Sequence, residues 1–438
     1  MNITYLRWKN HKQLNNLQLD LKNQNNSDEY KTIVLVGENG VGKTAILKSV
    51  ADFFAGGSKH SLEEFRCVSN NKNYLYLNLP INIHDKKITR TSGGAMLISD
   101  VKGAFCYSEA VISFDTNKIN SITNSDLDKN FYYSDKYQKG DYTKIKQLLI
   151  DISNKDNADL RMIVEKSAKL SKEEKRVFDM QSRIYRFKNA FNNFFDSLQF
   201  DRVDIKNLDV IFKKFDKEFS IDELSSGEKQ IVFRGATILK DINNFENGIV
   251  LIDEPEISMH PLWQAKILQY YKDLVSINGE QRCQLIIASH SENVLKSALN
   301  SKENTLIVIL KNENGFLVQD TIDHSLVLPI ATDAEINYFA FGVASIDFHN
   351  QLYAYYQNLT GNKSVKETDE LICKADGFDD IYKFESKYGT TKYHSLPTFI
   401  RNKIDHPDVT NGKQFNDDDL KKSIKCLIEL CKRMKPKI

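Results

Sequence analysis

The chain has 438 residues, of which 41% are apolar and 27% charged, and its formal net charge is +1. These values are ordinary for a globular protein and allow two or three domains. They exclude an overall field that attracts nucleic acid or membranes, so any such site must be local. The sequence has no apolar run of about 18 residues, no apolar signal core at its start and no C-x-x-C pair among its six cysteines. It therefore predicts a cytoplasmic protein with reduced thiols and no membrane partner.

The first elements are two strand-like segments, Ile3–Trp8 and Leu14–Leu21, and the apolar run Ile33–Val36, which predicts a buried parallel strand. That strand leads into G-x-x-x-x-G-K-T and a helical pattern over Thr44–Phe54. Strand, glycine loop and helix together predict a phosphate-binding loop, because glycines let backbone N–H groups surround phosphates at a helix N-terminus. Lys43 suits the β- and γ-phosphates, and the threonine hydroxyl suits Mg²⁺. The candidate residues for binding a nucleoside triphosphate here are Gly37, Asn39, Gly40, Gly42, Lys43 and Thr44.

The next segments change from a strand-like to a helical pattern. Polar and apolar residues alternate in Asn73–His84 and Ala110–Phe114, which predicts an antiparallel sheet. From about 125 to 200 the pattern is helical and charged, without a sustained heptad repeat. We expect a short helical insertion and no long coiled-coil arm.

Two later strands end in residues that suit catalysis. The apolar run after Gly248 ends in Asp253 and Glu254, and the strand that begins at Gln284 ends in His290. We expect Asp253 to hold Mg²⁺ together with the threonine of the glycine loop. Glu254 is placed to polarise the water that attacks the γ-phosphate. Thr305–Leu310 and Gly315–Val318 are predicted to close the lobe as a hairpin.

The segment Leu224-Ser-Ser-Gly-Glu228, shortly before the acidic strand, resembles the signature motif of the ABC ATPases. The phosphate loop, this segment, the acidic strand end and the histidine at the next strand end are four motifs in the order of that family. Together they cover roughly residues 1–325. The resemblance implies ATP as the nucleotide and His290 as the switch histidine that touches the γ-phosphate. It also implies a homodimer, in which Ser225, Gly227 and Glu228 of one protomer close on the nucleotide held by Lys43 of the other.

The D-E-P-E-x-x-x-H-P run that begins at Asp253 resembles soluble ATPases of the SMC, RecF, Rad50 and overcoming-lysogenization-defect groups, many of them phage-defence proteins. No permease is implied. Ser113–Lys118 lies about where the family has its lid loop, but offers Asp115 and Asn117 in place of glutamine.

Beyond residue 330 the pattern predicts helices only: Asp333–Phe341, Ile346–Leu359, Asp376–Tyr388, Leu396–Ile404 and Asp417–Met434. Arg401-Asn402-x-x-x-His406 resembles the Arg-x4-His pattern of HEPN domains, helical modules that often act as metal-independent ribonucleases. The resemblance implies that His406 moves a proton, Arg401 stabilises charge on a phosphate and Asn402 orients the substrate or the histidine. Two alternatives stay open, a HEPN fold used only for binding and a plain helix cap with a buried histidine.

The predicted fold class is therefore α/β. An ABC-type P-loop ATPase head over 1–330, with a helical insertion at about 125–200, is followed by an all-α HEPN-like domain over 331–438. The layout resembles anticodon-nuclease ATPases and the AAA-type ATPases of Septu-like and retron-linked defence systems. It implies an anti-phage toxin in which nucleotide-driven dimerisation controls cleavage of RNA or tRNA. The alternatives are an ATPase scaffold that regulates a separate nuclease or phage-sensing subunit, and a DNA-repair ATPase like RecF or Rad50.

Overall fold

The computed structural model divides into two compact units, Met1–Thr321 and Ile322–Ile438, which are described separately. It describes the whole chain except residues 23–28, 55–60, 70–71, 78–86, 91–94, 98–104, 109–141, 168–170, 242–247, 302–303, 314, 323–325, 362–363, 377, 389, 407–413 and 435–438. The predicted strand Ala110–Phe114 and the lid-loop candidate Ser113–Lys118 lie outside the described residues. None of the described helices is long and apolar enough to cross a bilayer.

The first unit is built on a six-stranded sheet in the order β17-β16-β3-β15-β12-β8. Strand β3 pairs in parallel with β15 and β16, and β12 pairs in parallel with β15 and β8. Every residue of β3, β12 and β15 is buried, which explains their continuous apolar runs. The strands are β3 (Thr32–Gly37), β8 (Phe105–Ser108), β12 (Ile249–Asp253), β15 (Gln284–Ser289), β16 (Thr305–Glu313) and β17 (Phe316–Ile322).

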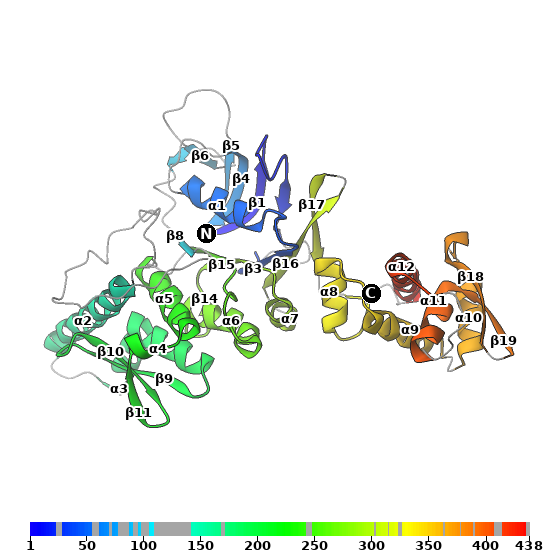
Figure 1. The fold of residues 1–438 in the computed structure, drawn as a ribbon. Helices are drawn as coiled ribbons and strands as arrows, with labels where there is room; N and C mark the ends of the chain where they lie inside the picture. The colour runs from blue at the N-terminus through cyan, green and yellow to red at the C-terminus, as the bar shows by residue number, and fades with distance from the viewer. Residues whose placement is uncertain are drawn as a thin grey trace. The chain divides into compact units, whose positions relative to one another are not determined.

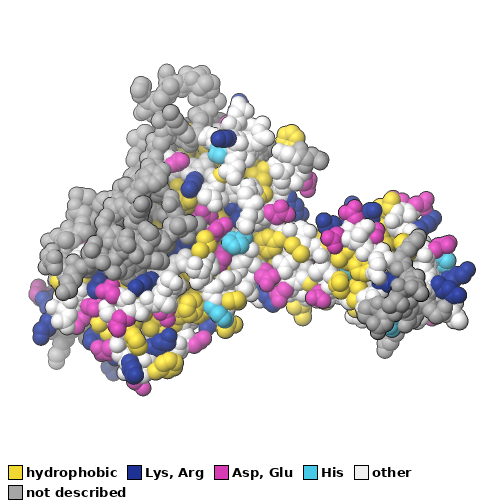
Figure 2. All heavy atoms as spheres, in the orientation of Figure 1, with side chains coloured by type: hydrophobic (Ala, Val, Ile, Leu, Met, Phe, Trp, Pro, Cys, Tyr) yellow, Lys and Arg dark blue, Asp and Glu magenta, His cyan; other side chains and the backbone are white. Residues whose placement is uncertain are grey.

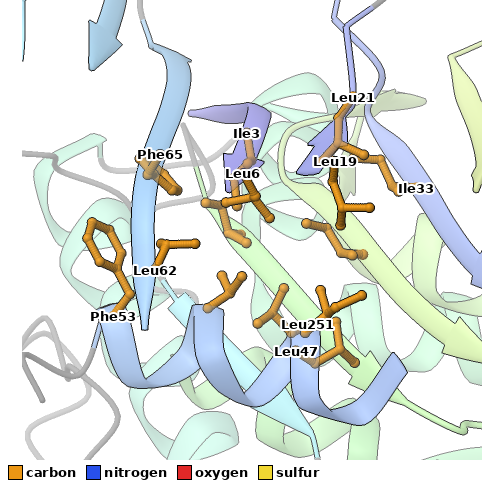
Figure 3. Packing of buried hydrophobic residues seen from close by; sticks show 14 of the residues in the cluster. Ile3, Leu6, Leu19, Leu21, Ile33, Leu47, Phe53, Leu62, Phe65 and Leu251 are labelled. Carbon is orange, nitrogen blue, oxygen red and sulfur yellow. The ribbon is translucent and has the colours of Figure 1, made fainter. Parts of the chain in front are cut away.

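A second sheet, in the order β2-β1-β4-β5-β6-β7, is antiparallel throughout. Its strands are β1 (Asn2–Trp8), β2 (Gln18–Asp20), β4 (Leu62–Ser69), β5 (Lys72–Leu77), β6 (Lys87–Arg90) and β7 (Ala95–Leu97). Helix α1 (Lys43–Phe54) contributes Leu47 and Phe53 to the core that joins the two sheets. There they lie near Leu6 of β1, Phe65 of β4 and Leu251 of β12 (Figure 3).

The side chain of Gln284 connects the two sheets. Its Oε1 accepts a hydrogen bond from the Ile3 amide at 2.7 Å, and its Nε2 donates to the carbonyl oxygens of Ile3 and Tyr30 at 3.1 and 2.9 Å. This buried amide therefore pairs with the backbone of β1 much as a neighbouring strand would.

The predicted helical insertion contains α2 (Tyr142–Ser167), α3 (Lys172–Gln181) and α4 (Arg183–Phe194). A meander of β9 (Leu198–Asp204), β10 (Asp209–Lys214) and β11 (Lys217–Ser220) follows and leads through a 3₁₀ turn (Ile221–Glu223) into α5 (Ser226–Asp241). This group lies beside α5 and α6 (Pro261–Leu274), on which α4 packs (Figure 1). Figure 2 shows basic and acidic side chains interspersed over its visible face.

The remaining elements of the first unit complete its central sheet. Helix α7 (Glu292–Asn300) follows β15, packs against α6 and contacts β16. A short hairpin, β13 (Ser276–Ile277) and β14 (Glu280–Gln281), connects α6 to β15.

The second unit has five helices among its described residues, and they surround a core that includes Phe348, Leu352, Ile400 and Leu427. Val327 and Leu328 already belong to this core. The helices are α8 (Asp333–Phe341), α9 (Ile346–Thr360), α10 (Val365–Lys374), α11 (Leu396–Asp405) and α12 (Asp417–Met434).

The prediction that this unit is all-α was wrong for the segment between α10 and α11. A 3₁₀ turn (Asp380–Tyr382) is followed by the antiparallel hairpin β18 (Lys383–Tyr388) and β19 (Thr391–Ser395), where a helix over 376–388 was expected. The reason is a period of two: exposed and half-buried side chains alternate from Lys383 to Lys387. Phe384 stacks on Phe399 of α11, with ring centroids 4.1 Å apart, so the hairpin covers that helix.

Candidate nucleotide-binding site

The phosphate loop lies between β3 and the N-terminus of α1. Gly37, Gly40 and Gly42 have φ angles of +151°, +81° and +105°, which L side chains rarely adopt. A Cβ atom on Gly42 would also lie 2.9 Å from Leu14 Cδ2. Close packing and backbone conformation together explain why glycine occupies this position, and the loop leaves the first amides of α1 available to an anion.

Lys43 is buried, and its ammonium group is held at the loop. Its Nζ donates to the carbonyl oxygens of Gly37 and Glu38 at 2.8 and 3.1 Å. Burial lowers the pKa of Lys43, while the carboxylates of Glu254, Glu256 and Asp253 act in the opposite direction. An incoming phosphate would supply a stronger, charged acceptor at this place.

Thr44 and Asp253 form the part of the site that suits Mg²⁺. The Thr44 hydroxyl donates to Asp253 Oδ1 at 3.2 Å. Burial raises the pKa of Asp253, and the hydrogen bond from Thr44 opposes that shift. Mg²⁺ binds through one or two carboxylates and substrate phosphates while keeping several waters. These oxygens fit that ion, and no described group of three or more His, Cys, Asp or Glu residues is arranged to hold a metal by itself.

Glu254 occupies a strained backbone position directly after β12. Its φ angle is +42°, and its amide donates to the carbonyl oxygen of Ala288 on β15 at 2.8 Å. The fully buried Arg234 of α5 donates to the carbonyl oxygens of Asp253 and Glu254 at 3.1 and 3.4 Å. Strained residues persist only where surrounding contacts hold them, and they concentrate at functional sites.

His290 lies at the end of β15, beside two carboxylates. Its Nδ1 is 3.4 Å from Glu254 Oε1 and 3.4 Å from Glu256 Oε1. Glu256 Oε1 also accepts hydrogen bonds from the Ser289 hydroxyl at 2.7 Å and the His290 amide at 2.8 Å. Because β3, β12 and β15 run in parallel, Lys43, Glu254 and His290 all meet at one edge of the sheet.

Sequence reasoning missed Glu256 and Arg234. The D-E-P-E run contained a signal for the first, since a second carboxylate follows the catalytic candidate after one proline. Nothing in the sequence marked Arg234, which is one basic residue within an amphipathic helix.

Ser225, Gly227 and Glu228 lie together at the start of α5. The Ser225 amide and hydroxyl both donate to Glu228 Oε2 at 2.8 Å, and the Glu228 amide donates to the Ser225 hydroxyl at 3.4 Å. This is a capping arrangement, which fixes the helix start and leaves Ser225 exposed. Among the described residues, no hydrogen bond or ion pair joins this group to the phosphate loop of the same chain.

The second candidate site is at the C-terminal end of α11. Arg401 Nη2 forms an ion pair with Asp405 Oδ2 at 2.8 Å, and Nη1 donates to Asn402 Oδ1 at 3.1 Å. His406 is exposed and follows the last helical residue, with its amide donating to the Asn402 carbonyl oxygen at 3.1 Å. Asp405, which sequence reasoning missed, therefore binds the guanidinium expected to act on a phosphate.

Helix α9 packs beside this second site and contributes a histidine to the core of the unit. This residue, His349, is fully buried, with Nε2 2.9 Å from Ser423 Oγ of α12. Burial lowers the pKa of His349 to about 4. Tyr353, one turn along, reaches α11 through a hydrogen bond between its hydroxyl and Thr398 Oγ1 at 3.1 Å.

Comparisons with known proteins find similarity to AAA-type and retron ATPases. Residues 100–296 match the family described as "AAA domain, putative AbiEii toxin, Type IV TA system". The chain is 24% identical to the Septu protein PtuA of Bacillus thuringiensis over 60% of its length and 67% of that protein. It is 23% identical to the "Retron Vc95 probable ATPase" of Vibrio cholerae over 63% of its length and 69% of the relative.

The "Retron Ec83 probable ATPase" of Escherichia coli is 29% identical over 39% of this chain, and the match spans 30% of that relative. Among solved structures, the SMC head domain from Thermotoga maritima covers 74% of the chain with a TM-score of 0.40 and 11% identity. The predicted similarity to AAA-type, Septu and retron proteins is confirmed. The HEPN-like domain stays a prediction.

Proposed function

We propose that this chain is a cytoplasmic, ATP-hydrolysing anti-phage defence protein whose nucleotide-driven dimerisation controls a HEPN-like ribonuclease in its second unit. One observation carries the ATPase part: Lys43, the Thr44–Asp253 pair, Glu254 and His290 meet at one edge of the central sheet. The similarity to Septu and retron proteins supports the defence role.

Each residue of the sheet edge has a distinct role in this proposal. Lys43 binds the β- and γ-phosphates, and Thr44 and Asp253 hold Mg²⁺, which neutralises charge on the phosphates when bound. Glu254 orients and polarises the attacking water, since its carboxylate lies beside His290 at the same edge. His290 contacts the terminal phosphate and couples its presence to β15.

The position of Ser225, Gly227 and Glu228 supports the proposed dimerisation. They form a pre-organised group with no polar contact to the phosphate loop of their own chain among the described residues, and Ser225 is exposed. In the proposed homodimer, this group closes on the nucleotide of the partner, so ATP binding stabilises the dimer and hydrolysis releases it.

The second unit would cleave RNA without a metal. His406 accepts the proton of a ribose 2′-OH, the 2′-oxygen attacks phosphorus, and the bond to the 5′-oxygen breaks as that oxygen takes up a proton from water. Arg401 stabilises charge on the phosphate, and Asn402 orients it. The exposure of His406 supports this role, and Arg401 would exchange its ion pair with Asp405 for the phosphate.

The Arg401–Asp405 ion pair also favours a second candidate function. A guanidinium that is already neutralised suits a structural cap, and the chain would then be an ATPase scaffold that regulates a separate nuclease subunit. The two candidates differ in whether the purified protein cleaves RNA on its own.

One experiment tests both candidates. Purified protein is incubated with total RNA and with tRNA, in EDTA and in ATP with Mg²⁺, beside Lys43→Ala, Glu254→Gln and His406→Ala, while phosphate release is measured in parallel. We expect Lys43→Ala and Glu254→Gln to lower ATP turnover by about a hundredfold or more. We expect RNA fragments with 2′,3′-cyclic phosphate ends that disappear with His406→Ala.

The outcomes separate the proposals. Intact RNA in every lane with normal ATP turnover would reject the ribonuclease and favour the scaffold. Unchanged ATP turnover in Lys43→Ala and Glu254→Gln would reject the assigned ATPase site itself.

A further inference from the structure

Glu256 is a buried carboxylate that the mechanism above does not use. Its residue is 3% exposed, and it follows the catalytic candidate Glu254 after Pro255. Oε1 accepts two hydrogen bonds, from the Ser289 hydroxyl and the His290 amide. Oε2 is buried without a hydrogen-bond partner among the described residues.

Burying a carboxylate with one unpaired oxygen costs free energy of desolvation, unless a nearby positive charge compensates it. Two groups near this carboxylate can carry positive charge. One is Lys43, whose pKa the Glu256 carboxylate raises by electrostatic attraction, and the other is the His290 ring, whose Nδ1 is 3.4 Å from Oε1. A neutral glutamine could accept the same two hydrogen bonds through its side-chain oxygen without that cost. The negative charge at residue 256 is therefore not needed for the two hydrogen bonds alone. Its role is the electrostatic interaction with the His290 ring and with Lys43.

We propose that Glu256 is a positioning residue for His290, an inference that rests on the ATPase part of the proposed function. Its Oε1 accepts a hydrogen bond from the backbone amide of that histidine and lies 3.4 Å from Nδ1 of the ring. Because carboxylate oxygens of Glu254 and Glu256 both lie beside Nδ1, they favour the tautomer that has its proton on Nδ1 and orient the ring toward them. Nε2 is then the nitrogen left to meet the terminal phosphate.

The surroundings allow His290 to act in this way. A cavity of about 500 Å³ lies beside it, lined by Glu256, Ser258, Gln264, Ser291 and Asn293 among others. The His290 side chain is 41% exposed, while that of Glu256 is 2% exposed. One partner of the pair is thus fixed in the protein and the other is accessible to a ligand.

The test is a double-mutant cycle on the full chain with Glu256→Gln and His290→Ala, since glutamine keeps the shape and the hydrogen-bond acceptor but removes the charge. We expect Glu256→Gln to lower kcat about tenfold or more with little change in the Kd for a fluorescent ATP analogue. In the His290→Ala background the same substitution should change kcat less than twofold. Glu280→Gln, at an exposed carboxylate of β14 outside the cavity and the proposed cluster, is the control and should retain wild-type kcat.

An equal effect of Glu256→Gln in both backgrounds would show that Glu256 acts independently of His290 and would overturn the proposal. The proposal would also be overturned if Glu256→Gln had the kcat of the wild type while His290→Ala had a lower kcat.

A second measurement does not depend on catalysis. Hydrogen exchange of peptides that contain His290 should be faster in Glu256→Ala than in the wild type, because the His290 amide loses its acceptor. Unchanged exchange would reject the positioning role even in a protein without ATPase activity. If the wild type does not hydrolyse ATP but exchange does respond, the ATPase proposal fails and the contact survives.

Discussion

His349 shows how one side chain can make the second unit sensitive to acid. Burial lowers its pKa to about 4, against 6.5 in an unfolded chain. Between about pH 6.5 and about pH 4, His349 is protonated in the unfolded state but stays neutral in the folded state. We therefore expect the stability of this unit to fall between about pH 6.5 and about pH 4, by about 3 kcal/mol from this group.

This pH dependence can be measured by hydrogen exchange of peptides from α9 and α12, with rates corrected for the intrinsic effect of pH. His349→Gln removes the titrating group, so the variant should be less stable at neutral pH but show a flatter profile. A profile as steep as that of the wild type would assign the acid sensitivity to other groups.

At the scale of elements, α5 approaches α4 and α6 closely because residue 235 is glycine. A Cβ atom at Gly235 would overlap the Tyr270 hydroxyl and lie 3.0 Å from Phe187 Cε2. The Tyr270 hydroxyl donates to the Ile231 carbonyl oxygen at 2.9 Å, so the overlap would also disturb that bond. Overpacking of this severity costs about 2–3 kcal/mol, and the gain in helix propensity offsets about 1 kcal/mol of it. We therefore expect Gly235→Ala to destabilise the first unit by about 1–2 kcal/mol.

Urea unfolding followed by tryptophan fluorescence suits this measurement, because both tryptophans, Trp8 and Trp263, lie in the first unit. Thr237→Ala, two residues along the same helix, is the control and should change stability by less than about 0.5 kcal/mol. Equal or greater stability of Gly235→Ala would mean that the three helices separate at little cost.

For the whole molecule, the proposed homodimer makes a quantitative prediction about mixed protomers. Lys43→Ala lacks the phosphate-binding lysine, and Ser225→Arg blocks the group at the start of α5. Each variant alone should be inactive. In an equimolar mixture half of the dimers pair one variant with the other, and each of these contains one intact composite site, so ATPase activity should return to about a quarter of the wild-type value.

Phosphate release from the mixture, titrated over protein concentration, measures this recovery. The control is Lys43→Ala mixed with itself at the same total concentration. A mixture that stays inactive while the variants still associate would mean that each chain contains its complete site.

The sequence predicted the nucleotide site better than the second site, for a physical reason. Lys43, Asp253 and His290 follow apolar runs, and parallel strands bring their carboxyl ends to one edge, so local patterns were sufficient to bring these residues together. Glu256 differs, because its importance depends on burial and on partners 33 and 34 residues away. No local pattern contains that information.

The hairpin between α10 and α11 illustrates a different limit. Its alternation spans only a few residues, and strands this short do not outweigh the helical patterns on both sides. The position of Arg401 on a helix followed from the sequence, but its ion pair with Asp405 depends on side-chain rotamers. Neighbouring residues on a helix have several possible partners, and sequence does not choose among them.

The strand order has a consequence for synthesis on the ribosome. Strand β3 is made early, yet its two neighbours in the sheet are β15 and β16, which emerge roughly 250 residues later, or about 10–50 s at typical translation rates. Until then its apolar residues have no sheet to join, which makes the nascent chain a client for chaperones. We therefore expect the phosphate loop to reach its folded conformation only after β15 and β16 have been synthesised. An incomplete chain should not bind a nucleotide.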